Sequence, residues 1–273
     1  MENHLEPITS QLEKITFRNG NFNIVPQALP ERHKDFWKLF VSKWEEENRN
    51  ALADFIDDET VVVDLGAWVG PLTLLSATLG AKHVYAYEPD PTAYAFLEKN
   101  CDANPQLKNK INIADKAIGK NDGEIYMGPL SGRSLGDSTT STEGTNLIPV
   151  PSISVETMRT ECHLDQANKI CIKIDIEGSE KYVLPNIAKM LADINKPFLL
   201  IIEIHSYHFN KEDSEVVEGA IDDLTAISDK VIFKQRRREG EPIQYPDKET
   251  EWRSELYHPH GLFDITFLRE QKK

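Results

Sequence analysis

Short apolar runs alternate with segments of helical periodicity from residue 60 onward. The runs are continuous and rich in β-branched residues, as expected for parallel strands that are buried on both faces. Between them, apolar positions recur every three or four residues, which is typical of helices that cover a sheet. The alternation predicts a parallel sheet with helices on both faces. Four of the five core strands are expected at TVVVDL (60–65), HVYAYE (83–88), KICIKID (169–175) and PFLLIIEIH (197–205).

Further extended segments lie between and after these runs. KINIADKAI (110–118) predicts a third core strand, IYM (125–127) a short extra one, and LFDITFL (262–268) an antiparallel strand at the sheet edge. The small, polar segment 131–145 predicts a mobile surface loop, and 236–260 reads as a polar insertion. The expected fold class is therefore α/β: a Rossmann-like, mostly parallel sheet with an antiparallel C-terminal edge strand.

The first 57 residues have a different pattern, polar with interspersed aromatic residues. We expect an N-terminal helical extension or cap over 1–57 and the Rossmann-like domain over 58–273. One stripe of aromatic residues has helical spacing and either packs against the main domain or lines a substrate pocket. It consists of Phe36, Trp37, Phe40 and Trp44.

The net charge indicates which partners to expect, and the cysteine usage indicates the cellular compartment. The formal net charge of -14 repels phosphate backbones and anionic membrane surfaces, so neither a nucleic acid nor a membrane is an expected partner. The three cysteines include no CxxC pair, the N-terminus has no apolar leader, and no apolar run approaches bilayer length. These features predict a cytoplasmic protein.

A glycine-bearing turn follows the first central strand, in the sequence DLGAWVG (64–70). Gly66 and Gly70 let the backbone turn sharply and approach a ligand, with Ala67 between them, and the next helix offers free N–H groups. Asp64 can accept hydrogen bonds from turn amides or from a ligand amino group. Glu88 lies about 20 residues beyond the turn, where a carboxylate can bind both ribose hydroxyls. An ordinary strand–helix turn and a solvated Glu88 are the alternatives, but together these residues favour a nucleoside cofactor.

The turn also discriminates between cofactors. Trp68 occupies the position of the middle glycine in the dinucleotide fingerprint GxGxxG, where a bulky side chain would crowd a pyrophosphate. S-adenosyl-L-methionine has no pyrophosphate and is the cofactor we expect. An NAD-dependent oxidoreductase on a related fold is the alternative.

Polar residues also end the later strands. Lys173, Asp175 and Glu177 lie on one side of a strand if it persists that far, where they form either a polar pocket or a strand-end salt bridge with a helix N-terminal acid. Glu203 and His205 end the next strand, so Lys173, Asp175, Glu203 and His205 should meet at one sheet edge. A carboxylate and an imidazole there can act as general base or bind a metal, although a strand-end histidine is often structural. We take the four residues as catalytic candidates and assign no metal ligands.

These motifs resemble the FkbM family of S-adenosylmethionine-dependent methyltransferases. The resemblance covers roughly 58–210 and rests on VVVDLGAWVGPLTL, YAYEPDPTAYAFLEKN, ADKAIGKNDGEIYM, SGRSLGDS, VPSISVETM and, most specifically, IKIDIEGSEKYVL followed by IIEIH. It implies a class I methyltransferase fold and O-methylation of a hydroxyl on a sugar or small metabolite. It also places Asp115 and Ala117 beside the adenine, and Asp64, Gly66, Gly70 and Glu88 on cofactor-binding positions.

This sequence departs from the family's motif pattern in two places, and the substrate of the family therefore cannot be assigned to this chain. Relatives often read GAN-x-G in the turn where this chain has Trp68, and segments 1–57 and 236–260 match no recognisable pattern. The resemblance therefore does not predict which molecule accepts the methyl group. We expect an in-line methyl transfer in which Asp175 or His205 acts as base and Lys173 tunes Asp175 by its charge. The second alternative, a methyltransferase-like binding protein without turnover, is disfavoured because the acids are present.

Overall fold

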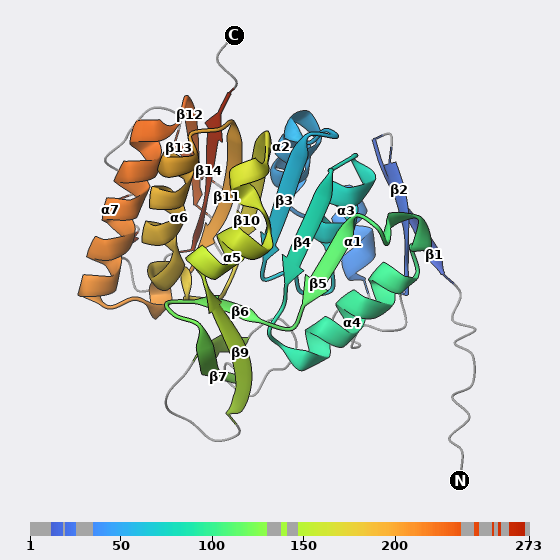
Figure 1. Cartoon of the computed structure of the whole chain (residues 1–273), viewed down its shortest axis with the longest axis horizontal. Coiled ribbons are helices and arrows are strands. Elements are labelled where there is room, and N and C mark those ends of the chain that lie inside the picture. The colour runs from blue at the N-terminus through green and yellow to red at the C-terminus, as the bar shows by residue number, and fades with distance from the viewer. Residues whose placement is uncertain are drawn as a thin grey trace.

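An eight-stranded sheet forms the centre of the computed structural model, in the order β13-β12-β14-β11-β10-β3-β4-β5 (Figure 1). The structure describes residues 12–18, 20–25, 35–129, 138–140, 147–235, 243–245, 253, 256–257 and 262–270. The strands of the sheet are β3 (Thr60–Leu65), β4 (His83–Tyr87), β5 (Ile111–Ala114), β10 (Lys169–Ile174), β11 (Phe198–Ile204), β12 (Lys230–Gln235), β13 (Ile243–Tyr245) and β14 (Phe263–Arg269).

Five neighbouring strands, from β11 to β5, are mutually parallel, and β14 is antiparallel to β11. The mostly parallel, Rossmann-like sheet with an antiparallel C-terminal strand is thereby confirmed. The expected edge position of that strand is wrong, because β14 pairs with β11 on one side and with β12 on the other. Its apolar side chains, Phe263, Ile265 and Phe267, are almost fully buried, as suits an interior strand.

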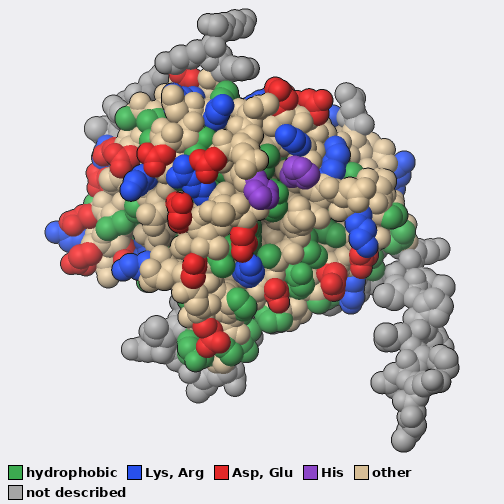
Figure 2. Space-filling view, viewed as in Figure 1, with side chains coloured by type: hydrophobic (Ala, Val, Ile, Leu, Met, Phe, Trp, Pro, Cys, Tyr) green, Lys and Arg blue, Asp and Glu red, His purple; other side chains and the backbone are tan. Residues whose placement is uncertain are grey.

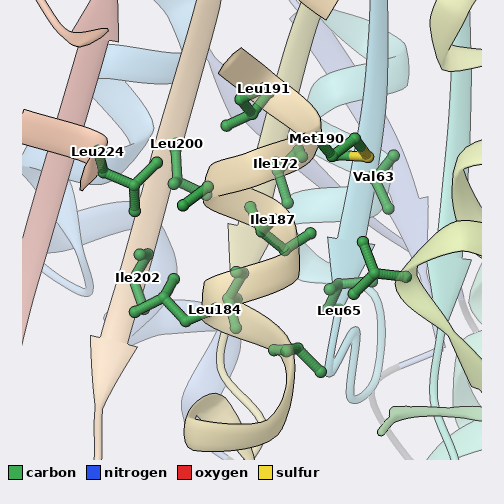
Figure 3. Close-up of a cluster of buried hydrophobic side chains, with 14 of the residues drawn as sticks. Val63, Leu65, Ile172, Leu184, Ile187, Met190, Leu191, Leu200, Ile202 and Leu224 are labelled. Atoms are coloured by element: carbon green, nitrogen blue, oxygen red, sulfur yellow. The ribbon is translucent and has the colours of Figure 1, made fainter. Parts of the chain in front are cut away.

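Helices cover both faces of the sheet, and alternate residues of each central strand supply the two cores. Val61 and Val63 pack with the face covered by α5, α6 and α7, whereas Val62 packs with the face covered by α1, α2 and α3. Figure 3 shows Leu184, Ile187 and Leu191 of α6 directed at the sheet. The helices are α1 (Phe36–Ser42), α2 (Glu46–Phe55), α3 (Pro71–Thr78), α4 (Pro91–Asp102), α5 (Val155–Glu161), α6 (Glu180–Ile194) and α7 (Lys211–Ile227), with single 3-10 turns η3 (Pro105–Leu107), η5 (Leu164–Gln166) and η6 (Ser206–His208).

The N-terminal segment is not purely helical, which corrects the expected helical extension. It contains a hairpin of β1 (Glu13–Phe17) and β2 (Gly20–Ile24) before α1 and α2. Buried residues alternate with others along β2, at Phe22 and Ile24, and this two-residue period is the strand signal that the aromatic stripe obscured. The hairpin, α1 and the sheet share one hydrophobic cluster. The boundary at residue 57 stays a prediction.

A second, four-stranded sheet in the order β6-β9-β7-β8 lies beyond the carboxyl ends of the central strands (Figure 1). The single strand expected over 110–118 is in fact two, β5 and β6, because the polar pair Asp115-Lys116 interrupts the apolar run and β6 joins β9 instead. Only 138–140 of the expected loop 131–145 are described, and most of 236–260 lies outside the described residues. The strands are β6 (Ala117–Gly119), β7 (Gly123–Pro129), β8 (Ser138–Thr140) and β9 (Ile148–Ser154).

None of the helices in the described part of the chain combines the length and the apolar character needed to cross a bilayer.

Candidate active site

The turn after β3 passes very close to the end of β10. Gly66 has φ +77°, and a Cβ atom built there would lie 1.8 Å from the backbone oxygen of Asp175. The N–H groups of Gly66 and Ala67 both donate to the carbonyl of Tyr87 on β4. Gly70, at φ +88°, ends the turn and caps α3. A glycine at position 66 is therefore required by both conformation and space.

Glu88 directly follows β4 and is held by that turn. Its Oε2 accepts a hydrogen bond from the backbone N–H of Trp68 (2.7 Å), and its Oε1 accepts one from the N–H of Asp90 (2.8 Å). The side chain is only 6% exposed, and burial raises the pKa of Glu88 to about 7. The carboxyl group is thus fixed in orientation at the cavity wall, with one lone pair of each oxygen left for a ligand.

Glu88→Gln is expected to change how stability depends on pH. Because the folded state raises the pKa of Glu88 from 4.5 to about 7, its ionisation destabilises the wild type as pH rises through this window. The wild type should lose up to about 3 kcal/mol relative to the variant between pH 4.5 and 7, and no more above it. Urea denaturation of both proteins at pH 5, 6, 7 and 8 measures this difference. Two unfolding free energies that run parallel across the series would contradict it.

Asp64 and Lys173 form a buried pair between neighbouring strands. The register of β3 and β10 sets them side by side, and Lys173 Nζ lies 3.8 Å from Asp64 Oδ1. Thr73 on α3 donates its hydroxyl hydrogen to Asp64 Oδ2 at 2.6 Å, and the turn amides, one of the two partners considered for Asp64, are not the donors to this oxygen. Burial raises the pKa of Asp64, against the lowering effect of Lys173. Asp64 Oδ1 has no hydrogen-bond partner among the described residues.

Lys173 also reaches the next acid along the chain. Its Nζ donates to the carbonyl of Gly66 (2.8 Å) and lies 3.3 Å from Asp175 Oδ2. Burial by itself lowers the pKa of Lys173, but the carboxylates of Asp175 and Asp64 outweigh it, so the pKa is raised. Lys173 is therefore a fixed positive charge that favours the ionised form of Asp175.

A cavity of about 300 Å³ connects these groups. Five residues expected to bind the cofactor line it, and so do two of the catalytic candidates. Two others expected to bind the cofactor are not among the lining residues: Gly70 caps α3, and Asp115 is exposed. Phe36, Trp44 and Trp68 form an aromatic wall, with the Phe36 and Trp68 rings 4.6 Å apart at 89°. The predicted residues in the lining are Asp64, Gly66, Ala67, Glu88, Ala117, Lys173 and Asp175.

His205 and Glu203 lie beside Asp175 at the carboxyl edge of the sheet. The Nε2 atom of His205 is 3.7 Å from Asp175 Oδ1 and 3.8 Å from Glu203 Oε1. Burial by itself lowers the pKa of His205, but the carboxylates of Glu180, Glu177 and Asp175 raise it to about 10. A histidine that holds its proton at neutral pH is a poor general base.

Glu180 is the residue that sequence reasoning missed. It opens α6, is 0% exposed, and its Oε1 lies 3.0 Å from His205 Nδ1. The same oxygen accepts from the N–H groups of Ile176 and Gly178. A third acid in the run from Asp175 to Glu180, immediately before an apolar helix, was the available signal, but only the fold shows that it faces His205.

A mostly parallel sheet with a glycine turn after β3 and a buried carboxylate after β4 defines a Rossmann-like domain of the class I methyltransferase type. The family model of the methyltransferase FkbM domain matches 64–234. The chain belongs to this family of methyltransferases, as the motif resemblance predicted.

Individual relatives are more distant. Hexuronic acid methyltransferase AglP of Haloferax volcanii is 24% identical over 173 residues, which cover 63% of this chain and 67% of that protein. Ribosomal protein L11 methyltransferase of Streptococcus thermophilus is 38% identical over 64 residues, or 23% of this chain and 20% of that protein. A crystal structure of methyltransferase FkbM from Methylobacillus flagellatus KT has a TM-score of 0.45 and 15% identity, with 89% of this chain and 56% of that one covered. The chain thus matches only part of each protein.

Proposed function

We propose that this protein transfers a methyl group from S-adenosylmethionine to a hydroxyl of a sugar or small metabolite. The observation that carries the proposal is a shared cavity, which has Glu88 and the Gly66 turn on one part of its wall and Asp175 on another. A nucleoside held by the first group and a hydroxyl held by the second would share this one cavity. Positioning of this kind supplies much of the catalysis when the cofactor carries an activated group.

The residues present fit S-adenosylmethionine. The carboxylate oxygens of Glu88 each keep a lone pair for a ribose hydroxyl, and the buried Asp64 Oδ1 lacks a hydrogen-bond partner among the described residues. That oxygen can accept from the amino group of the methionyl part. NAD is the alternative cofactor, and the Trp68 side chain, packed against Phe36 at the cavity wall, disfavours its pyrophosphate.

Asp175 is the proposed general base. When bound, S-adenosylmethionine supplies the methyl group: its C–S bond breaks as the C–O bond to the acceptor forms, and the electron pair stays on sulfur. The acceptor hydroxyl has to give up a proton, and Asp175 accepts it. The ammonium group of Lys173 lies 3.3 Å from Asp175 Oδ2 and interacts favourably with its negative charge.

A sugar or small metabolite is the proposed acceptor, with action in the cytoplasm. The similarity to a hexuronic acid methyltransferase supports a sugar, and the aromatic wall suits the apolar face of a sugar ring. The net charge of -14 disfavours a nucleic acid or an anionic membrane. On the face in Figure 2, acidic and basic side chains interleave, without a continuous basic area among the described residues. The free cysteines Cys101, Cys162 and Cys171 suit a reducing compartment.

Calorimetric titration followed by a transfer assay tests the proposal. We expect saturable binding of S-adenosylmethionine and of its demethylated product, and no binding of NAD at the same concentration. Glu88→Ala should abolish this binding, whereas Glu98→Gln, at an exposed position of α4, should not change it. Labelled methyl transfer to a panel of sugars, uronic acids and small hydroxylated metabolites then identifies the acceptor. Binding of NAD would overturn the cofactor assignment, and cofactor binding without transfer to any acceptor would favour a binding protein.

A further inference from the structure

Three side chains beside the cavity are arranged as ligands around one point. Asp175 and Glu177 come from the segment after β10, and His205 comes from the end of β11. One ligand atom from each residue can be chosen so that all of these atoms lie within 4.8 Å of one another. Asp175 and Glu177 also line the cavity, so the point between the three residues borders the space proposed for the acceptor.

The imidazole of His205 is set up to present one nitrogen to that point. Its side chain is only 3% exposed, and Nδ1 lies 3.0 Å from Glu180 Oε1. A histidine that binds a metal almost always donates its other N–H to a carboxylate or carbonyl in this way. The pairing with Glu180 leaves Nε2 as the atom that faces Asp175 and Glu177, and a cation bound there takes the place of the Nε2 proton, which passes to solvent.

The distances around Nε2 are too long for direct charge-assisted hydrogen bonds. Nε2 lies 3.5 Å from Glu177 Oε2 and 3.7 Å from Asp175 Oδ1, whereas such bonds are about 2.7–2.9 Å long. Two ligands bound at about 2.1 Å to one octahedral ion are separated by about 3 Å. An ion between these atoms needs only a small inward movement of the side chains.

Acidic side chains outnumber the two basic side chains, Lys173 and His205, around which they lie. Among the described residues, five carboxyl groups lie within 4 Å of Lys173 Nζ or of a His205 ring nitrogen. Ionised acids crowded at a partly buried site repel one another unless a cation is present. The five acids are Asp64, Asp175, Glu177, Glu180 and Glu203.

We propose that Asp175, Glu177 and His205 bind one divalent cation of the Mn²⁺ or Mg²⁺ type. Two carboxylates and one imidazole are a hard, oxygen-rich ligand set that suits such ions. Asp175 can serve both this site and its role as a base, because its Oδ1 faces His205 and its Oδ2 faces Lys173. Glu180 is a positioning residue that holds the imidazole.

This inference deepens the proposed function and rests on it for the role of the ion. The ion, held by Asp175, Glu177 and His205, would supply a positive charge that stabilises an oxygen anion, so an acceptor hydroxyl beside it would lose its proton more readily. Asp175 Oδ2 would accept that proton, and the C–O and C–S bonds would change as described above. The ion is neither oxidised nor reduced.

Titration of the full chain with Mn²⁺ at pH 7.5, followed by electron paramagnetic resonance of the free ion, tests the site without activity. We expect about one bound ion per chain and displacement by excess Mg²⁺. Glu177→Gln should weaken binding at least about tenfold through loss of a ligand, and Glu180→Gln by about 10- to 100-fold through the imidazole. Glu98→Gln, which removes an exposed carboxylate far from the cluster in sequence, is the matched control and should bind like the wild type.

Either of two results would overturn the proposal: a free-ion signal unchanged by the wild type, or equal binding by the wild type and Glu177→Gln. Glu177 is partly exposed, so this variant is expected to fold, and cofactor titration of the same sample verifies that it does. The test also separates the two proposals. Mn²⁺ binding without methyl transfer would count against the function alone, whereas full transfer in excess EDTA would count against the ion alone.

Discussion

Asp175→Asn is expected to lower kcat for methyl transfer by about 10²–10⁴-fold, the range typical of losing a general base. Asparagine has nearly the same shape but cannot accept the acceptor proton at neutral pH. The fold should persist, because Asp175 is only partly buried and Lys173 keeps its hydrogen bond to the carbonyl of Gly66. The cofactor dissociation constant should change less than about threefold, because Glu88 and the glycine turn are unaffected.

Steady-state kinetics and calorimetry on the same preparations measure these two effects separately. Asp58→Asn is the matched control, since Asp58 is exposed before β3 and is not among the residues that line the cavity. It should leave kcat and cofactor affinity unchanged. If Asp175→Asn turned over at the wild-type rate, Asp175 would be excluded as the base. If it lost cofactor binding instead, its role would be in the binding of the cofactor.

Gly66→Ala is expected to destabilise the protein by about 4 kcal/mol or more, among the largest effects of a single substitution. The added Cβ would lie 1.8 Å from the backbone oxygen of Asp175, so β3 and β10 would have to move apart. The left-handed conformation at φ +77° adds a further cost of about 1 to 3 kcal/mol. Any folded fraction should also bind the cofactor poorly, because the turn would be displaced.

Two other glycines separate the collision from the conformational cost. Gly80 has φ +112° but nothing within 4 Å of an added Cβ, so Gly80→Ala should cost only the strain. Gly219 lies inside α7 with open space, so Gly219→Ala should be neutral or slightly stabilising. Chemical denaturation of the three variants gives the comparison. Equal stability of Gly66→Ala and Gly80→Ala would show that the close approach to Asp175 does not matter.

Much of the site was predictable because its residues follow strands that the hydrophobic pattern makes evident. Asp64, Glu88, Asp175 and His205 each follow or end a continuous apolar run, and parallel strands bring their carboxyl ends to one edge. The helix-like aromatic stripe was less informative. Its spacing indicated α1, but the hairpin before it and the contact between Phe36 and Trp68 depend on residues far apart in the sequence.

The amino-acid sequence by itself determined the alternation of strands and helices, the sharp turn at Gly66 and the acids at the strand ends, because these depend on local periodicity and residue type. Only the tertiary structure decided the interior position of β14, the pKa of Glu88 near 7 and the placement of Glu180 behind His205. These depend on strand order and burial, which bring together groups with no regular spacing along the chain. The cation site proposed at His205 depends on the same packing, since only the tertiary structure brings ligand atoms of Asp175, Glu177 and His205 within 4.8 Å of one another.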